Sequence, residues 1–378
     1  MGHAVVVGGG IGGLTAALAL RAKGWSVAVY ERAPALEAVG AGLAVAPNGL
    51  RALDVVGVGD RIREAAAFGE AAAGVRSHDG TWLIKTDRRA AEERWGDLAV
   101  VVPRARLVAA LAERLGAEAL HLGVTVEGVD PDSGTVTTTA GTAEGDLVVA
   151  ADGIRSPTRA ALFPDHPGPV YSGETTWRWL LPRVEMTVGG VEYWGPTGAI
   201  ATMPLADRAL YMYAAALVPA GERADDEREV LLDRFGDWPE PLPELLATTE
   251  PGSVLRSDVH HLATPLPAFH KGRVAVLGDA AHAMVPHLGQ GACQAIEDAV
   301  VLAHEIAHGD GLPGYTRARL PRCTKVAADS LSTMRLSMAR HFVPIALRNT
   351  GLRIAARVAP RAGLRRLDPI LTWRPPEA

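Results

Sequence analysis

The residues whose spacing points most directly to a function in this sequence are glycines, not acids, bases or metal ligands. Gly8, Gly10 and Gly13 have the spacing of a loop whose backbone N–H groups, at the start of a helix, face the phosphates of a dinucleotide. The first glycine allows a tight turn, the second lets the backbone approach the pyrophosphate, and the third allows close helix–strand packing. Glu31 ends the next apolar run, where its carboxylate can accept hydrogen bonds from ribose hydroxyls.

A second group of such residues follows another apolar run, much later in the chain. Asp279 comes directly after Gly278, and a loop then leads into a helix expected over 292–304. No Lys or Arg stands within Gly289–Gly291, so backbone N–H groups at the start of this helix would stabilise a negative ligand atom. The residues of this loop expected at a ligand are Pro286, Gly289, Gln290, Gly291 and Ala292.

The elements that must hold these residues give an α/β fold. The β-branched run 4–7, the helical pattern that stops near Gly24 and the run 26–30 form one β-α-β unit. Runs 146–151 and 273–277 also end at polar turns, as strands of a doubly wound sheet do on the side that faces a ligand. These patterns predict a Rossmann-like domain.

The rest of the chain has different sequence patterns. Residues 166–267 alternate between apolar and polar residues and are broken by Pro and Gly, which predicts an inserted antiparallel sheet. After about residue 316 the pattern is helical and rich in arginine. We expect C-terminal helices with solvated arginines, although a reversible, weak contact with an anionic membrane surface also fits. The arginines are Arg335, Arg340, Arg348, Arg353, Arg357, Arg361, Arg365, Arg366 and Arg374.

Composition narrows the class of partner. The chain has 378 residues, with 43 acidic and 38 basic side chains, a net charge of −5 and a hydrophobic content of 48%. A mildly acidic chain without a basic stripe before the C-terminal region is not expected to bind nucleic acid, so the partner should be a small molecule. Two cysteines without a C-x-x-C pair favour a reducing, cytoplasmic location and no metal site. No apolar run is long enough for a transmembrane segment.

Taken in order, the motifs resemble those of one enzyme family. Residues 152–159 (DGIRSPTR) are similar to a D-G-x-x-S-x-x-R segment, and Gly278-Asp279 is similar to a second flavin segment. Arg104 matches an arginine that contacts FAD, Pro47-Asn48 matches a loop near the flavin ring, and 295–299 and 315–319 complete the order. The chain resembles the single-component FAD-dependent aromatic hydroxylases of the para-hydroxybenzoate hydroxylase type.

The resemblance implies roles and boundaries. FAD would contact Gly8, Gly10, Gly13, Glu31, Arg32, Arg104, Asp152, Asp279, Pro286, Gly289, Gln290, Gly291 and Ala292. The FAD-binding domain would comprise 1–75, 98–165 and 268–325, the substrate domain 76–97 and 166–267, and the C-terminal helical region 326–378. NADH or NADPH would reduce FAD, O2 would form a flavin hydroperoxide, and one oxygen atom would hydroxylate or epoxidise the substrate.

The sequence indicates less about the substrate than about the reaction. The stretch 193–205 has no Lys or Arg, which favours a neutral aromatic or polycyclic compound. The side chains expected at the pocket are Trp177, Trp179, Met203, Tyr211 and Tyr213, although the tryptophans or the tyrosines could equally face the sheet core. For the reacting centre the sequence offers His287, Pro286 and Tyr211 without deciding among them.

Two other enzyme classes share some of these features. Residues 177–182 (WRWLLP) are similar to a W-x-W-x-I-P signature of flavin-dependent halogenases, in which Lys85 would be the reactive lysine. A nicotinamide dehydrogenase would use the same glycine loop, but only one such loop is present for a reaction with two dinucleotides. A third motif, H-E-x-x-H over His304–His308, lacks a further ligand where a metalloprotease would have one, so we expect no zinc there.

Overall fold

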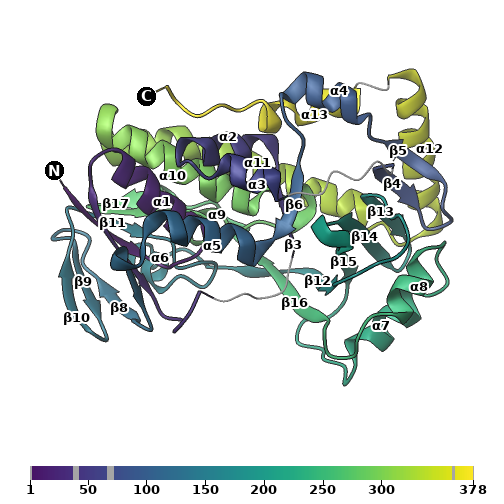
Figure 1. Cartoon of the computed structure of the whole chain (residues 1–378), viewed down its shortest axis with the longest axis horizontal. Helices are drawn as coiled ribbons and strands as arrows, with labels where there is room; N and C mark the ends of the chain where they lie inside the picture. Colours follow the sequence, from purple (N-terminus) through teal and green to yellow (C-terminus); the bar gives the residue numbers. More distant parts are fainter. Residues whose placement is uncertain (1, 37–41, 66–71, 360–361, 378) are drawn as a thin grey trace.

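The computed structural model describes residues 2–36, 42–65, 72–359 and 362–377. Two large sheets dominate, one in each half of the molecule (Figure 1). The six-stranded sheet runs β17 (His270–Lys271), β18 (Val274–Val276), β11 (Leu147–Ala150), β1 (His3–Val7), β2 (Ser26–Glu31), β7 (Leu120–Leu122). All pairs in it are parallel except β17–β18. The expected α/β fold with a Rossmann-like domain is confirmed.

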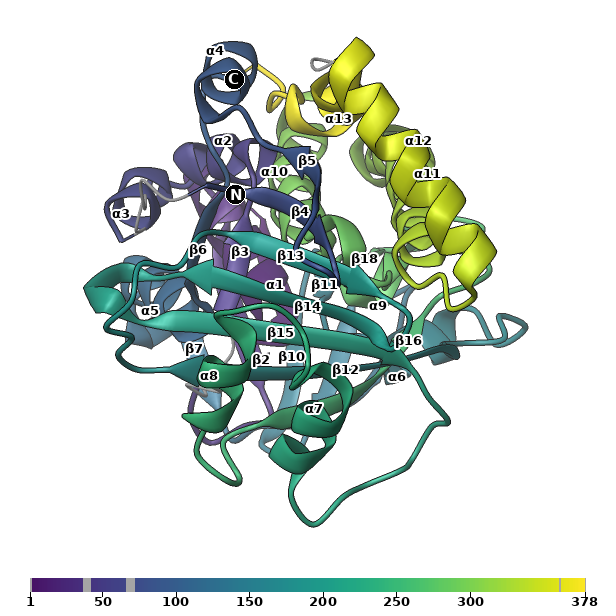
Figure 2. The ribbon, with the colours of Figure 1, turned by 90° about the vertical axis from the view of Figure 1, so that its right-hand side faces the viewer.

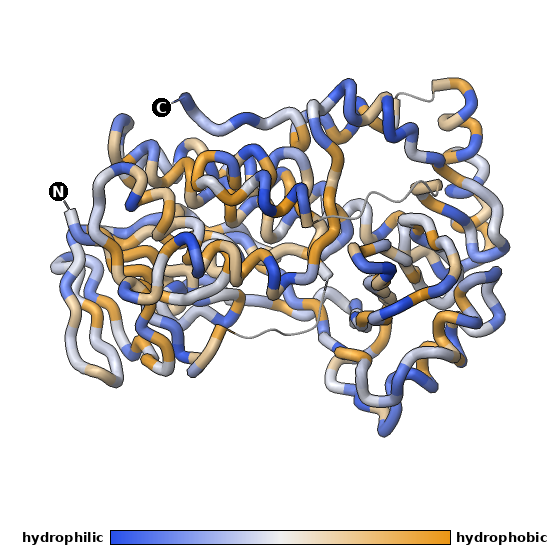
Figure 3. The backbone as a smooth tube through the Cα atoms, in the orientation of Figure 1, coloured by the Kyte–Doolittle hydropathy of each residue, from blue (hydrophilic) through white to orange (hydrophobic). Residues whose placement is uncertain are grey.

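The parallel sheet forms because its strands are short and apolar on both faces. Ala4, Val5 and Val6 are fully buried, as are Val148 and Val149 of the neighbouring strand. Such strands need helices on both faces. The helices that complete this half are α1 (Ile11–Ala22), α2 (Pro47–Val55), α3 (Gly59–Glu64), α5 (Arg104–Leu115), α6 (Pro157–Leu162), α9 (Asp279–His282) and α10 (Gly291–His308). Figure 3 shows orange, hydrophobic segments inside this half as well as in the other.

Smaller sheets connect and flank this half. The pair β3 (Gly42–Val45) and β6 (Val100–Pro103) is antiparallel. The sheet of β8 (Val126–Val129), β9 (Thr135–Thr138) and β10 (Gly141–Glu144) lies at the end farthest from the second large sheet (Figure 1).

The seven-stranded sheet builds the other half. Its order is β16 (Leu255–His261), β12 (Val170–Leu181), β15 (Leu210–Leu217), β14 (Gly198–Pro204), β13 (Val191–Gly195), β4 (Gly74–Ser77), β5 (Trp82–Lys85). All pairs are antiparallel except β13–β4. In Figure 2 its strands cross the molecule, with α7 (Glu227–Phe235) and α8 (Leu242–Ala247) below and α12 (Phe342–Val358) at the upper right.

The C-terminal helices return along the molecule. Long α11 (Gly311–Ser337) packs against α10, α12 lies against β5, and α13 (Ala362–Leu371) reaches α2 and α4 (Arg88–Trp95). Asp368 fixes this last contact, because its carboxylate pairs with Arg94 and accepts a hydrogen bond from Trp95 Nε1 at 3.1 Å. Among the described helices, none is both long and apolar enough to cross a bilayer.

Candidate active site

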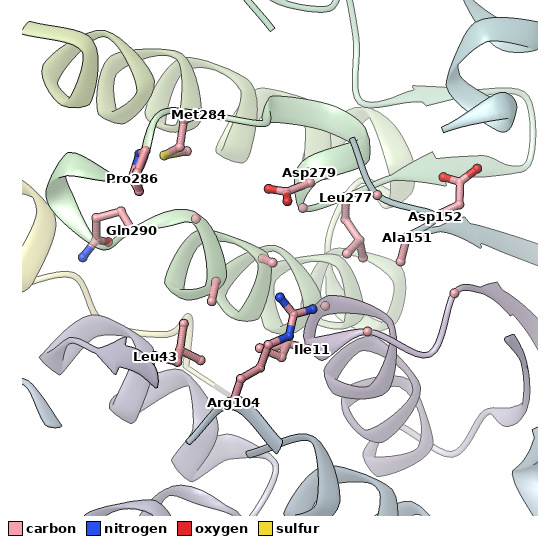
Figure 4. A pocket seen from close by; sticks show the side chains of 18 of the residues that line it. Ile11, Leu43, Arg104, Ala151, Asp152, Leu277, Asp279, Met284, Pro286 and Gln290 are labelled. Atoms are coloured by element: carbon pink, nitrogen blue, oxygen red, sulfur yellow. The ribbon is translucent and has the colours of Figure 1, made fainter. Parts of the chain in front are cut away.

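One large cavity, of about 730 Å³, joins the two halves of the molecule. At one end lie Gly8, Gly10 and Gly12 of the β1–α1 loop, and at the other lie side chains of the seven-stranded sheet. Residues 286–292, in the loop before α10 and at its start, also line the cavity. In Figure 4 the labelled side chains surround this space from several elements far apart in the sequence.

The glycine end is shaped for close approach of a ligand to backbone. Gly8 has φ of 107°, and a Cβ there would lie 2.4 Å from the Ala151 carbonyl oxygen. A Cβ on Gly13 would lie 2.0 Å from the Gly8 oxygen, so Gly13 does not line the cavity and instead allows α1 to pack on β1. Gly10 lines the cavity, with no atom within 4 Å of its absent Cβ. This open backbone fits a pyrophosphate.

Glu31 and two arginines flank the glycine loop and line the cavity. Glu31 Oε2 accepts a hydrogen bond from Gly9 N at 2.7 Å, and Oε1 accepts one from Ala33 N at 2.9 Å. The carboxylate therefore ties β2 to the loop, and each oxygen keeps a lone pair for a further donor. Arg32 and Arg104 also line the cavity. Arg104 extends from α5 toward Ile11 (Figure 4).

Two aspartates line the cavity, Asp279 near its middle and Asp152 toward one end (Figure 4). Asp152 Oδ2 accepts a hydrogen bond from Thr158 N at 3.2 Å, whereas Asp152 Oδ1 is buried and has no partner among the described residues. A buried carboxylate oxygen without a donor is costly, so this atom fits a ligand hydroxyl or N–H group. Asp279 begins α9 directly after Gly278, whose φ is 60°.

A buried ionic network holds the Gly278–Asp279 turn from behind. Asp298 of α10 accepts hydrogen bonds from Gly278 N at 2.9 Å, His282 Nε2 at 2.5 Å and Arg319 Nε at 2.6 Å. Burial raises the pKa of Asp298, but the positive charges of His282 and Arg319 outweigh this and hold the pKa well below its usual range. Residues 295–299 and 315–319, noted in the sequence, thus act as a support for the site.

Gln290 and Asn48 belong to the same buried layer. Gln290 lines the cavity, and its Oε1 accepts hydrogen bonds from Asn48 Nδ2 at 2.9 Å and Gln294 Nε2 at 3.2 Å. Asn48 also donates to Glu297 Oε1 at 2.7 Å. Asn48 does not line the cavity, and its amide instead supports the loop that carries Gln290. From this part of the chain, 42–44 line the cavity instead.

The start of α10 offers backbone donors to the cavity. Pro286, Gly289, Gly291 and Ala292 all line it, and Gly289 has φ of 61°. The N–H groups in the first turn of an α-helix have no partner within the helix, and its dipole favours a negative atom there. Cys293 points away into the core, where burial raises the pKa of its thiol to about 12.

The strand alternation decides which aromatic side chains reach the cavity. Met203, Tyr211 and Tyr213 line it, whereas Trp177 and Trp179 do not. The tryptophans pair with Ala214 and Met212 of β15, on the opposite face, and pack in the core beneath α7 and α8. Trp177 Nε1 also donates to Glu227 Oε2 at 2.7 Å. Their assignment to the pocket is therefore wrong.

Two charged cavity residues were missed in the sequence. Arg178 pairs with Tyr213, and Glu192 with Ala201, so both side chains share the face of the tyrosines and line the cavity. Arg178 Nη2 donates to Ser257 Oγ at 3.0 Å, and its buried Nε has no partner among the described residues. Burial raises the pKa of Glu192, favouring its neutral form. Because side chains alternate along a strand, the position of Arg178 between Trp177 and Trp179 could have shown that it faces away from them.

His287 lines the cavity and forms a buried hydrogen-bonded chain. Its Nε2 lies 2.6 Å from Glu174 Oε1, and its Nδ1 lies 3.2 Å from Ser337 Oγ of α11. The side chains of His287 and Glu174 are 2% and 0% exposed. Glu174 Oε2 and the Tyr213 hydroxyl are buried without partners among the described residues. Burial and the charges of Glu174 and Glu192 raise the pKa of Tyr213 well above its usual value.

The motifs that suggested other chemistry lie outside this cavity. Lys85 is exposed on β5, with Nζ 5.2 Å from the centre of the Trp82 ring, and Trp177 is in the core. His304 and His308 stand 5.7 Å apart at the end of α10, where His308 Nε2 lies 3.2 Å from Lys23 Nζ. No geometry here joins these residues to the Gly8–Asp279 site.

Comparison with known proteins decides the family. The family described as "FAD binding domain" matches residues 2–329. The chain is 37% identical over 341 residues to the aurachin C monooxygenase/isomerase of Stigmatella aurantiaca, covering 86% of this chain and 87% of that protein. The chain belongs to the FAD-dependent aromatic monooxygenases. The predicted resemblance and the predicted FAD cofactor are thereby confirmed, and a halogenase is not favoured.

Other members of the aromatic monooxygenases are similar over most of their length. The FAD-dependent urate hydroxylase of Klebsiella pneumoniae is 33% identical over 310 residues, which cover 79% of this chain and 80% of that protein. The crystal structure of Klebsiella pneumoniae HpxO with FAD and uric acid gives a TM-score of 0.86 at 28% identity and covers 94% of both chains. This fold therefore holds FAD in a protein of similar size.

Proposed function

We propose that this monooxygenase uses NADH or NADPH and O2 to insert one oxygen atom into an aromatic small molecule. The single observation that carries this proposal is the continuous cavity, which connects a dinucleotide loop to a sheet face with polar and aromatic side chains. When bound, FAD would accept electrons from the nicotinamide and use them to activate O2. The protein then has to position the substrate, exclude water and move protons. The two free cysteines fit a cytoplasmic location.

The residues fit this cofactor in three places. The open backbone at Gly8 and Gly10 would hold the pyrophosphate, with Arg32 and Arg104 close to its negative charge. Glu31 would accept a ribose hydroxyl, and Asp152 or Asp279 would accept hydroxyls farther along. The start of α10, from Gly289 to Ala292, would face the negatively charged end of the reduced flavin ring.

The substrate we propose is an aromatic or polycyclic compound without net charge that carries both a hydrogen-bond donor and an acceptor. Met203, Tyr211 and Tyr213 give an apolar, aromatic face to the substrate end. Arg178 offers its unpartnered Nε as a donor, and Glu192, whose raised pKa favours the neutral acid, offers a hydroxyl donor and a carbonyl acceptor. The neutral substrate expected from residues 193–205 stays our proposal, although Arg178 and Glu192 make the pocket more polar than that stretch indicated.

For proton transfer we propose His287 as the base and Glu174 as the residue that positions it. With Nε2 held by Glu174, the His287 ring would take a proton at Nδ1, through the Ser337 hydroxyl 3.2 Å away, from an aromatic hydroxyl or ring N–H of the substrate. Loss of that proton makes the substrate ring more reactive toward electrophilic oxygen. The Glu174 carboxylate, 2.6 Å from Nε2, would hold the ring and stabilise the imidazolium. Removing a general base slows the step it assists by about 10²–10⁴-fold.

Glu174→Gln tests this assignment and leaves the imidazole ring of His287 in place. Oxygen transfer to the substrate should slow by about 10²-fold, and its pH profile should change, while anaerobic flavin reduction keeps its rate. Exposed Glu185→Gln is the matched control and should leave both steps unchanged. Equal slowing of reduction and oxygen transfer in Glu174→Gln would mean that the pair only holds the fold.

The reaction itself is tested by mixing the FAD-loaded protein anaerobically with NADH or NADPH. We expect the flavin absorbance to bleach, faster when a suitable aromatic compound is present. On admission of O2, the mass of the product should increase by one oxygen atom. Flavin that is never reduced by either nicotinamide, or a product that carries halogen in place of oxygen, would overturn the proposed function.

A further inference from the structure

The exposed apolar surface of this molecule is concentrated on one helix. Five large apolar side chains of α12 are more than half exposed, and no other described large apolar side chain exceeds 43%. The five are Phe342 at 85%, Val343 at 63%, Leu347 at 70%, Ile354 at 56% and Val358 at 79%. Single exposed apolar residues need no explanation, but a group of this size on one element marks an interaction site.

These side chains form a stripe along the helix. Val343, Leu347, Ile354 and Val358 are separated by four, seven and four residues, so they lie on one face. The opposite face of α12 is anchored to the protein. Arg348 donates to the Ser337 carbonyl at 2.9 Å and lies 5.3 Å from the centre of the Trp194 ring, and Asn349 Nδ2 donates to Ser77 Oγ at 3.0 Å. The fold therefore fixes which face is free.

The charge around the stripe has a single sign. No Asp or Glu occurs from Ser330 to Leu367. Arg353 and Arg357 each precede a residue of the stripe and so lie beside it on the helix. Six arginines of this region are exposed, and no ion pair between described residues includes any of them. They are Arg335, Arg340, Arg353, Arg357, Arg365 and Arg366.

We propose that α12 docks this enzyme on the surface of an anionic phospholipid bilayer. A helix with an apolar stripe beside arginines lies in the plane of the interface, with its apolar side chains among the acyl chains and its arginines at the phosphates. The helix docks without spanning, because it is too short and too polar to cross. Docking by this face leaves the anchored face on the protein, so the enzyme binds without unfolding any part of the described fold.

A second copy of the chain is a poorer occupant of the same face. Two α12 helices packed through their stripes would bring the unpaired Arg353 and Arg357 of both copies together, and like charges at close range are unfavourable. Anionic lipid headgroups complement the same arginines, each of which contributes to binding at a negative surface. Charge therefore selects the bilayer over self-association.

The test uses full-length, FAD-loaded protein and sedimented vesicles. One set of vesicles is phosphatidylcholine alone and the other an equimolar mixture of phosphatidylcholine and phosphatidylglycerol. We expect binding to the mixed vesicles that weakens with added salt, and at least about tenfold weaker binding to the neutral ones. Two variants separate the contributions: Leu347→Gln with Ile354→Gln interrupts the apolar stripe without changing the charge, and Arg353→Glu with Arg357→Glu reverses the charge.

Each variant should bind mixed vesicles at least about tenfold more weakly than the wild type. Matched controls are Val55→Gln, at an exposed valine of α2, and Arg61→Glu with Arg89→Glu on α3 and α4, which should bind as the wild type does. Flavin absorbance and thermal unfolding confirm that each variant is folded. The proposal is overturned if the wild-type protein does not bind the mixed vesicles. It is also overturned if the wild type forms a dimer in solution and the stripe variant is a monomer.

Discussion

The hydrogen-bonded network around Asp298 allows the stability of Asp298→Asn to be predicted. This change keeps the size of the side chain and removes its charge. The carboxylate is fully buried and accepts hydrogen bonds from Gly278 N, His282 Nε2 and Arg319 Nε. Breaking a buried ion pair on one side costs about 3–5 kcal/mol, because the partner charge stays buried. Since Glu297 still pairs with Arg319, we expect the free energy of unfolding to fall by about 3 kcal/mol.

The same substitution should weaken FAD binding. Asp298 holds the backbone of Gly278, which precedes the cavity residue Asp279, so a loosened turn should raise the Kd for FAD by about tenfold, or about 1.4 kcal/mol. Urea unfolding followed by tryptophan fluorescence measures the first effect, and FAD titration of the apoprotein measures the second. The control is Asp329→Asn on α11, which removes an exposed pair with Lys325 and should cost at most about 0.5 kcal/mol. Equal stability of the two variants would refute this reasoning.

Three further predictions follow from individual side chains. Both thiols should resist a thiol reagent in the native protein, because both are buried and the pKa of Cys293 is about 12; rapid labelling would contradict this. Burial lowers the pKa of His282, but Cys323 and Asp298 together raise it well above its ordinary 6.5. Its stabilising contribution is therefore complete below pH 6.5 and is lost as the pH rises toward the folded-state value. The stability gap between wild type and His282→Asn should then shrink by about 1.4 kcal/mol per pH unit above 6.5, measured by urea unfolding, and a constant gap would refute it. Arg178→Met should raise the KM for substrate about tenfold and leave anaerobic flavin reduction without substrate unchanged, whereas Trp179→Phe, in the core, should change stability and leave KM unchanged.

The glycine end of the cavity could be predicted from the sequence because it depends on the conformation of the backbone. A glycine such as Gly8, with positive φ and no room for a Cβ, leaves a mark at its own position. The same holds for Asp279, which must follow directly after a strand and a glycine. Local sequence therefore predicted these contacts and the parallel sheet together.

The end of the cavity at the seven-stranded sheet could not be predicted in the same way. Alternation shows that Trp177 and Trp179 share a face and that Arg178 has the other, but it does not say which face meets the cavity. That choice depends on where α7 and α8 pack, which is a property of the whole fold. Similarly, Glu174 and His287 are 113 residues apart and meet only when the sheet and the α10 loop come together.

The most direct test of the proposed monooxygenase is the fate of molecular oxygen labelled with ¹⁸O. The FAD-loaded protein is supplied with NADH or NADPH and a panel of uncharged aromatic compounds, and the products are weighed by mass spectrometry. We predict that a compound which accelerates nicotinamide oxidation gains a single ¹⁸O atom in proportion to the nicotinamide consumed. If the added oxygen comes from water, or if every compound returns all the oxygen as hydrogen peroxide, the proposed function is wrong.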